Sequence, residues 1–450
     1  MARPEAWRSQ KSTQLLVVGT RRHDDDELYK KLQPGPGLSS EQVLAHQRAR
    51  LCGAMLELAA DQGVRNVTVR GLTARAGVST RAFYECFANA EACFGATYSR
   101  IVHNLLAGAI EMPPAGEAEV RACARALLAS LAENPDAARL VLVESQLAGP
   151  AARKESLGAV TAFERLIREG FSIEPNPVVP PPRVVRAIAG AAIWIARSRL
   201  RSRPTALDGV ADEFVDWMLA LRDSQVERLP VIDRFRAMAA FRPPGREPVG
   251  EERGFLLTAA AKLSAAEGYD SLTVPRIRRE AGVSRRSFDA NFGGVAECFL
   301  EAVETRTKAA VRGAESEAKR AASSWERALV RILSSLCAGV ARDPGFARLA
   351  FLEILAPGPE GLVKSEQIVN YWSERLRRTA PVERRPGPFA AEASVAAIWS
   401  LTQCEVLSGR GRRIDEAIAE MAFVLLAPMT GARPAGRAIR AEFDESIANR

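Results

Sequence analysis

The chain has 450 residues, of which 47% are hydrophobic and only 6% aromatic, and its formal net charge is +8. This composition is typical of a soluble, mostly helical protein. No apolar run approaches the ~20 residues of a membrane helix, and QLLVV, followed at once by RRHDDDE, is too short for a secretory signal. We therefore expect a cytoplasmic protein with no membrane partner.

Residues with catalytic or metal-binding chemistry are sparse. The seven cysteines include no CxxC pair, which favours a reducing compartment over a disulfide framework. His23, His46 and His103 do not have the spacing of metal ligands, and the sequence lacks a GxSxG elbow, a phosphate loop and a dinucleotide fingerprint. We predict no enzyme activity, no catalytic residue, no metal site and no cofactor.

The chain is an internal duplication. The stretch AGVSTRAFYECF at 76–87 returns as AGVSRRSFDANF at 281–292, an offset of 205 residues. This offset exceeds the roughly 20 to 50 residues of a solenoid repeat and fits a complete domain or a close pair. Further residues have an identical counterpart 205 positions later: Leu51, Ala54, Leu58, Gly63, Thr68, Val69, Cys93 and Phe94.

The first predicted helix follows a tail at residues 1–38, which we expect to be solvated and disordered. Ser39 with Gln42 forms a capping box, which marks the start of a helix. The helix then runs to Gly63, with one apolar face made of Leu44, Leu51, Met55 and Leu58.

A helix-turn-helix motif follows the first helix. The hydroxyl of Thr68 can cap a second helix. This helix ends at Gly77, the residue best able to adopt the left-handed conformation of a tight turn. Val78 is placed to fill the angle between the helices, and Ser79 to cap the third.

The third helix has one buried and one outer face. Phe83 and Phe87, four residues apart, share the buried face. The outer face then carries Thr80, Arg81 and Tyr84. A single copy would also fit an ordinary helical hairpin with a glycine turn. Two copies, each followed by a long helical region, favour a motif that presents a recognition helix to DNA.

Basic residues concentrate in these motifs. Residues 64–84 contain no acid but include Arg65, Arg70, Arg75 and Arg81. The second copy has Glu280 among Arg276, Arg278, Arg279, Arg285 and Arg286. Such clustering is what attraction to DNA phosphates requires, although an arginine-rich composition explains the global charge equally well.

With these features the chain resembles the tetracycline-repressor (TetR) family. The resemblance rests on the capped first helix, the Thr-Val start of the second, the AGVS turn, the aromatic third helix ending in Phe, and a fourth helix opening with Glu-Ala-Cys-Phe or Ala-Glu-Cys-Phe. It covers Ser39 to about Arg222 and Pro248 to about Thr430. It implies an all-α DNA-binding regulator, most often a repressor, whose helical effector domain binds a small molecule and moves the recognition helices.

The resemblance also gives each repeat two domains. We predict helix-turn-helix domains at 39–95 and 248–301, helical effector and dimerisation-like domains at 96–222 and 302–430, a linker at 223–247 and a C-terminal tail at 431–450. Family members normally form homodimers through a four-helix bundle of their last two helices. Those helices correspond here to 184–200, 207–221, 388–407 and 414–426. One chain thus holds both halves of a dimer and is expected to be a monomeric pseudo-dimer, with pairing between two chains as the alternative.

The family pattern assigns the expected contacts with double-stranded operator DNA. These residues are Thr68, Ser79, Thr80, Arg81 and Tyr84 in the first motif and Thr273, Ser284, Arg285 and Arg286 in the second. Tyr84 matches a position that commonly contacts the DNA backbone, whereas Asp289 stands there in the second copy. Ala90 and Val295 occupy the place of a phosphate-binding lysine. We expect the first motif to bind DNA more conventionally, with Arg285 partly offsetting Asp289.

Three hypotheses about function follow. Because the outer faces differ, a chain using both motifs should prefer an asymmetric operator, with guanine under the second motif, since arginine pairs with guanine O6 and N7. Alternatively, the second motif is a scaffold, or the whole chain is a helical ligand carrier that has abandoned DNA. A ligand pocket is expected at 96–192 or 302–397, for a hydrophobic or amphipathic effector.

Two further pairs of residues match between the repeats. Trp194 and Trp399 are expected to pack in a core or interface rather than to contact a ligand. Cys93 and Cys298 are expected to be buried apolar residues rather than redox sensors.

Overall fold

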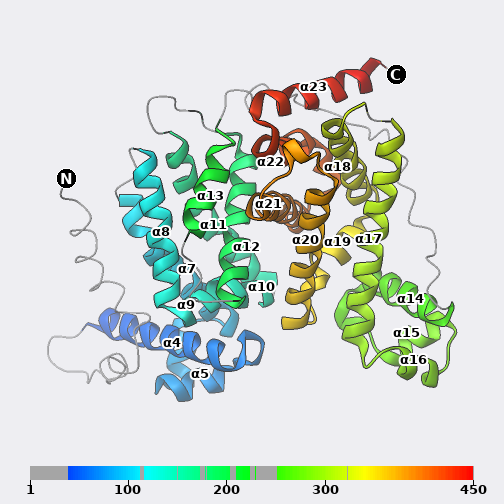
Figure 1. Ribbon diagram of the computed structural model, residues 1–450. Coiled ribbons are helices and arrows are strands. Elements are labelled where there is room, and N and C mark those ends of the chain that lie inside the picture. The colour runs from blue at the N-terminus through cyan, green and yellow to red at the C-terminus, as the bar shows by residue number, and fades with distance from the viewer. Residues whose placement is uncertain are drawn as a thin grey trace. The chain divides into compact units, whose positions relative to one another are not determined.

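The computed structural model describes residues 39–111, 116–148, 150–172, 180–202, 209–222, 251–321 and 323–448, with the single positions 178 and 229. The predicted N-terminal tail and nearly all of the predicted linker lie outside these ranges. Every regular element within them is helical, which confirms the all-α prediction (Figure 1). No helix in the described ranges is long and apolar enough to cross a membrane.

The chain divides into two compact units. The first contains residues 1–175 and 196–212, and the second contains 176–195 and 213–450. Two helices of the first repeat, α12 (Pro182–Ser202) and α13 (Val210–Leu219), therefore contribute most of their length to the second unit.

The first unit begins with the predicted three-helix domain and continues into a helical body. The three-helix domain consists of α4 (Ser40–Gln62), the 3-10 turn η1 (Val64–Asn66), α5 (Val69–Ala76) and α6 (Thr80–Cys86). The body consists of α7 (Ala90–Glu111), α8 (Glu117–Glu133), α9 (Pro135–Arg139), the π-helical segment η2 (Leu140–Glu144), α10 (Ser145–Leu147) and α11 (Pro150–Phe171).

The core of the first three-helix domain includes part of the predicted apolar face of α4: Leu51 and Met55 are buried and Leu58 is half-buried, whereas Leu44, in the first turns of the helix, is exposed. Leu51 from α4, Leu72 from α5 and Phe83 from α6 are fully buried together. Burying a side chain such as Phe83 contributes about 1.5–3 kcal/mol to stability. The capping box at Ser39 is present, because Ser39 accepts from the Gln42 amide at 3.1 Å and donates its own amide to the Gln42 side chain at 2.8 Å. The first helix and its boundaries are therefore confirmed.

The second unit repeats this order and adds a C-terminal helix. Its remaining elements are α14 (Glu251–Glu267), η4 (Tyr269–Ser271), α15 (Val274–Ala281), α16 (Arg285–Asn291), α17 (Val295–Ala321), α18 (Trp325–Arg342), α19 (Pro344–Phe351), η5 (Glu353–Leu355), α20 (Pro359–Thr379), η6 (Val382–Arg384), α21 (Pro388–Leu407), η7 (Gly411–Ala417), α22 (Ile418–Thr430) and α23 (Ala432–Ala448). The segment assigned from sequence only to a C-terminal tail is thus mostly the helix α23, which packs against α22 and α18.

Both repeats contribute helices to one bundle in the second unit. The rings of Trp194 on α12 and Trp399 on α21 pack edge to face at 6.4 Å. The indole of Trp217 on α13 donates to the Ser394 hydroxyl on α21 at 3.0 Å. Both tryptophans of the matched pair are buried, at 4% and 7% exposure, so the prediction that they pack in a core or interface is confirmed.

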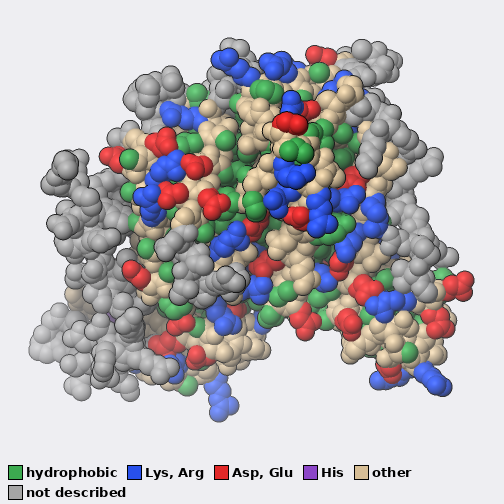
Figure 2. All heavy atoms as spheres, viewed as in Figure 1, with side chains coloured by type: hydrophobic (Ala, Val, Ile, Leu, Met, Phe, Trp, Pro, Cys, Tyr) green, Lys and Arg blue, Asp and Glu red, His purple; other side chains and the backbone are tan. Residues whose placement is uncertain are grey.

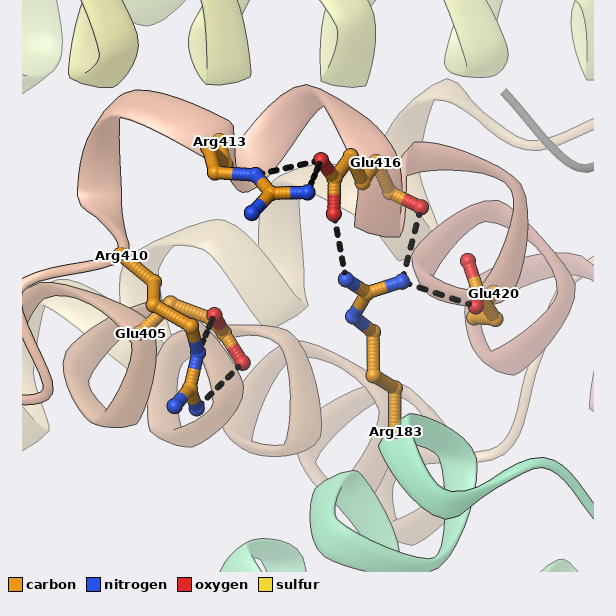
Figure 3. A network of polar contacts seen from close by, with 6 residues as sticks. All are labelled: Arg183, Glu405, Arg410, Arg413, Glu416 and Glu420. Atoms are coloured by element: carbon orange, nitrogen blue, oxygen red, sulfur yellow. Dashed lines mark hydrogen bonds and ion pairs between the residues drawn. The ribbon is translucent and has the colours of Figure 1, made fainter. Parts of the chain in front are cut away.

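A polar cluster joins α12 to η7 and α22 (Figure 3). Arg183 on α12 donates to a carboxylate oxygen of Glu416 at 3.0 Å and approaches Glu420 at 3.5 Å. Arg413 pairs with the other oxygen of Glu416 at 2.6 Å. An arginine from the first repeat is therefore held between two acids of the second.

Candidate DNA-binding interface

The first helix-turn-helix motif is positioned by three local devices. The hydroxyl of Thr68 accepts from the Gly71 amide at 3.1 Å and caps α5. The hydroxyl of Ser79 accepts from the Ala82 amide at 3.2 Å and caps α6. Gly77 lies between the helices with φ of +60°, a left-handed conformation that side chains with a Cβ disfavour. All three devices agree with the sequence prediction.

The second motif uses the same devices. Thr273 caps α15 by accepting from the Arg276 amide at 3.4 Å. Ser284 caps α16 by accepting from the Ser287 amide at 3.1 Å, and Gly282 has a φ of +69°. The four capping hydroxyls that are expected to contact DNA thus already accept from backbone amides, and each keeps its O–H to donate to a phosphate oxygen.

The outer face of α6 is open to solvent. Thr80, Arg81 and Tyr84 are all exposed, and Tyr84 has a relative exposure of 58% although its ring lies edge-on against buried Phe83. Arg81 is not free, because its Nε donates to Glu85 Oε1 at 3.2 Å one turn further along the helix.

The outer face of α16 has a different charge arrangement. Arg285 donates to Asp289 at 3.3 Å, so the aspartate that replaces Tyr84 is paired on its own helix. The neighbouring Arg286 is exposed, and the residue one turn later is Ala290, at the position of Glu85 in the first motif. Within the described second repeat, no carboxylate pairs with Arg286. Figure 2 shows basic side chains, with acidic ones beside them, on the surface over α15 and α16.

Several arginines of the two predicted basic segments are already paired with other groups of the protein. Arg75 forms an ion pair with Glu57 from α4, and Arg65 donates to the Leu147 carbonyl at 2.8 Å. In the second copy Arg276 pairs with Glu267, and this pairing lowers the pKa of the Glu267 carboxyl. A window free of acids along the chain therefore does not imply free arginines, because the acids come from the preceding helix.

Sequence reasoning missed an arginine that fixes the end of each recognition helix. Arg48 on α4 donates to the Cys86 carbonyl at 3.0 Å, with its guanidinium 4.5 Å from the Phe87 ring centre. Arg253 on α14 does the same, donating to the Asn291 carbonyl at 2.7 Å and lying 4.4 Å from the ring centre of Phe292. The available signal was the identical arginine at the same offset of 205, on the polar side of the first helix.

The matched cysteines lie near the start of the helix that follows each motif, Cys93 in α7 and Cys298 in α17. Cys93 and Cys298 are fully buried, as the sequence predicts. Burial raises the pKa of the Cys298 thiol to about 12, so the thiol stays protonated and unreactive at neutral pH. Among the described residues, no group of three or more His, Cys, Asp or Glu is arranged to hold a metal ion.

Comparison with known proteins identifies these two domains. Residues 53–97 and residues 256–302 each match the family described as bacterial regulatory proteins, tetR family. Each match contains one of the helix-turn-helix motifs described above. No curated protein matches the chain at a significant level.

The fold and the two motifs define a DNA-binding transcriptional regulator. The chain carries two units in tandem, and the helix-turn-helix domain of each is similar to that of the tetR family.

Proposed function

We propose that this regulator is a single-chain repressor that places both recognition helices on one asymmetric operator and leaves it when a small hydrophobic or amphipathic effector binds. One observation carries the proposal: the two motifs have the same caps and the same turn but different outer faces. Two motifs with the same local structure but different DNA-facing residues fit an operator whose two half-sites differ in sequence.

The charge arrangement on α16 supports DNA binding by the second motif. An unpaired aspartate facing phosphate would be repelled, but Arg285 pairs with Asp289 on the same helix and partly offsets its charge. Arg286 remains available to a guanine edge or a phosphate. In the first motif Glu85 competes for Arg81, and Tyr84 supplies the neutral donor. We therefore expect Arg286 of the second motif to contribute more to base recognition than Arg81 of the first. Tyr84 of the first motif is expected to donate to a phosphate as a neutral group.

The bundle in the second unit supports pairing within one chain. Helices α12 and α13 of the first repeat contact α21 and α22 of the second through an aromatic pair, a buried hydrogen bond and the Arg183 cluster. These contacts have the character expected of a TetR-type dimer bundle. A second chain is then not needed to complete it.

Release from DNA is a linkage between effector and operator. A pocket in the helical bodies, within 96–192 or 302–397, would bind the effector in the arrangement that is incompetent for DNA. To shift the population from 99:1 to 1:99, the effector must prefer that arrangement by about 10⁴-fold. Competent recognition helices must lie one turn of DNA apart, about 34–36 Å.

The test is selection of preferred DNA from a random-sequence pool by the purified chain, with the mass of the complex measured in solution. We expect a two-part asymmetric site bound by one chain. Arg81→Ala should relax one half-site and Arg286→Ala the other, each by about 1–3 kcal/mol of discrimination. Arg165→Ala is the matched control, since Arg165 pairs with Glu169 four residues later on α11, away from the motifs.

The possible results separate the hypotheses. A palindrome bound by two chains would refute the single-chain arrangement. If Arg286→Ala changes nothing, the second motif is a scaffold. If the chain selects no DNA and shows no salt-dependent affinity for any fragment, it is a ligand carrier, because phosphate contacts must release counterions.

A further inference from the structure

Each DNA-binding domain is hydrogen-bonded to its own helical body through a glutamate carboxylate. In the first unit Glu144 Oε2, at the end of η2, accepts from the backbone amide of Val64 at 2.8 Å. In the second unit Glu353 Oε2, at the start of η5, accepts from the amide of Tyr269 at 2.8 Å. Both amides open the short 3-10 turn between the first and second helices of the domain.

The second oxygen of each carboxylate is also occupied. Arg139 donates to Glu144 Oε1 at 3.1 Å, and Arg348 donates to Glu353 Oε1 at 2.7 Å. In both units the arginine lies five residues before the glutamate. The glutamate side chains are only 3% and 14% exposed, so removing either would leave a sequestered amide without its acceptor. We call each carboxylate with its bound amide a latch.

The glycine before each amide supplies a backbone conformation that other residues rarely adopt. Gly63 and Gly268 have φ of +79° and +87°. A Cβ on Gly63 would make an ordinary contact, 3.7 Å from Glu144 Oε2. A Cβ on Gly268 would meet Arg348 Nη2 at 3.1 Å, with the nearer oxygen of Glu353 at 3.5 Å. The identical glycines of the two repeats therefore belong to the same device.

The latch is one of several attachments of each motif to its body. The first helix of each domain also packs against the body, α4 against α7 and α9, and α14 against α17 and α19. In the first domain Arg65, in the same turn as Val64, adds its hydrogen bond to the Leu147 carbonyl. The latch attaches the turn that precedes α5 or α15, so the second helix of each domain is tied to the body as well as the first.

The backbone that carries the latch is irregular in both repeats, but in different ways. Glu144 ends a π-helical segment, whereas Glu353 begins a 3-10 segment after Leu352 leaves regular helical geometry with φ of −114°. Such segments mark places where helical hydrogen bonding changes register. The same carboxylate contact is thus made from two different backbone geometries.

We propose that Glu144 and Glu353 are positioning residues, through which each body sets the orientation of its recognition helix. This inference rests on the DNA-binding function proposed above. It assigns the transmission of a change in the body to a hydrogen bond at the turn between the first two helices, in addition to the covalent path through α7 or α17.

The test compares Glu353→Ala with Glu353→Gln in the full chain. Hydrogen exchange is measured in peptides covering 268–273 and 285–291, together with affinity for the operator obtained from the random pool. Glutamine keeps an acceptor oxygen for Tyr269, whereas alanine removes it. The matched control is Glu315→Ala, because Glu315 is also 14% exposed and pairs with Arg375 inside the same body.

We expect Glu353→Ala to speed exchange at 268–273 by about ten-fold, the scale of a lost hydrogen bond to a charged acceptor. Exchange at 285–291 should stay unchanged and operator affinity should fall by about ten-fold, because the recognition helix is intact but misdirected. Glu353→Gln should stay within about three-fold of the wild type in both measurements, since it keeps an acceptor. Glu315→Ala should change neither.

Three results would overturn the inference. Unchanged exchange at 268–273 in Glu353→Ala would show that the latch does not hold the turn. Faster exchange at 285–291 as well would show that Glu353 only stabilises the domain. Unchanged operator affinity despite faster exchange at 268–273 would show that the turn does not set the orientation. A wild-type chain that selects no DNA would refute the proposed function, while the exchange measurement still decides whether the latch exists.

Discussion

Glu280 in the second DNA-binding domain occupies the position of Arg75 in the first. Each forms an ion pair with the first helix of its domain, and the two charges of the pair are exchanged between the copies. Arg75 on α5 pairs with Glu57 on α4, and Glu280 on α15 pairs with Lys262 on α14. All four positions are related by the offset of 205 residues. Both charges exchanged while the pair remained, so the two copies diverged through compensating changes that keep the same contact between the first and second helices.

The reversed pair predicts a charge-swap experiment. Glu280→Arg places two cations together and should destabilise the second unit by about 0.5–1 kcal/mol, the scale of exposed ion pairs. Adding Lys262→Glu recreates the arrangement of the first repeat and should restore the loss. Urea unfolding at low and high salt measures both steps, and salt should shrink the effect. Strictly additive effects of the two substitutions would show that the side chains do not interact.

The pair on the recognition helix α16 predicts a gain from removing a charge. Asp289→Asn frees Arg285 for a phosphate and removes repulsion, so operator affinity should rise about three- to ten-fold, and the slope of log affinity against log salt should steepen by about one. Glu374→Gln serves as the control, because Glu374 pairs with Arg377 and Arg378 on α20, outside the motif. An unchanged slope would place Asp289 away from the DNA.

The sequence predicted the features that depend on local spacing. Caps at Ser39, Thr68 and Ser79, the turn at Gly77 and the buried Phe83 all follow from one-turn periodicity and backbone preference, and each is confirmed. The duplication made the second motif equally predictable, since the two caps, the turn glycine and the buried phenylalanine recur at one offset as Thr273, Ser284, Gly282 and Phe288.

Contacts between distant segments were not predictable in the same way. The latch joins Val64 to Glu144, eighty residues away, and nothing in either local pattern indicates the other. The ion pair of Arg75 arises because the acid stands on a different helix. Comparison of the two repeats could have found these contacts, since Glu353 and Arg348 recur at the later offset of 209.

The close contact between α12 and α21 at Gly190 predicts that a larger residue there destabilises the bundle and that a smaller residue opposite it restores stability. A Cβ on Gly190 of α12 would lie 2.4 Å from the Ser400 Cβ on α21, a distance that forces the helices apart. Gly190→Ala should therefore destabilise the second unit by about 1–3 kcal/mol. Adding Ser400→Gly should restore much of the loss. Thermal unfolding measures both steps, and a midpoint independent of protein concentration is expected if the bundle forms within one chain. A midpoint that rises with concentration would instead indicate pairing between chains.

The Arg183 cluster predicts opposite pH dependences for its two acids (Figure 3). Burial raises the pKa of Glu420 despite its contact with Arg183. The folded chain then holds a proton that the unfolded chain has released, so this group lowers stability as the pH rises above its ordinary pKa of 4.5. For Glu416, burial alone would raise the pKa, but hydrogen bonds from Arg413 and Arg183 outweigh it and lower the pKa. Its stabilisation is present above pH 4.5 and is lost as the pH falls through the folded-state pKa.

Two glutamine substitutions separate these contributions. At pH 7 Glu416→Gln should destabilise the second unit by about 1 kcal/mol, the scale of a partly exposed ion pair, and the deficit should vanish as Glu416 is protonated in acid. Glu420→Gln should stabilise the unit at pH 7, because a buried charge is removed while Arg183 keeps Glu416. Urea unfolding of both variants and the wild type at pH 7 and at acid pH values down through the folded-state pKa of Glu416 gives the differences directly, since other titrating groups cancel. A Glu416→Gln deficit that persists below that folded-state pKa would show that the loss comes from packing rather than from charge.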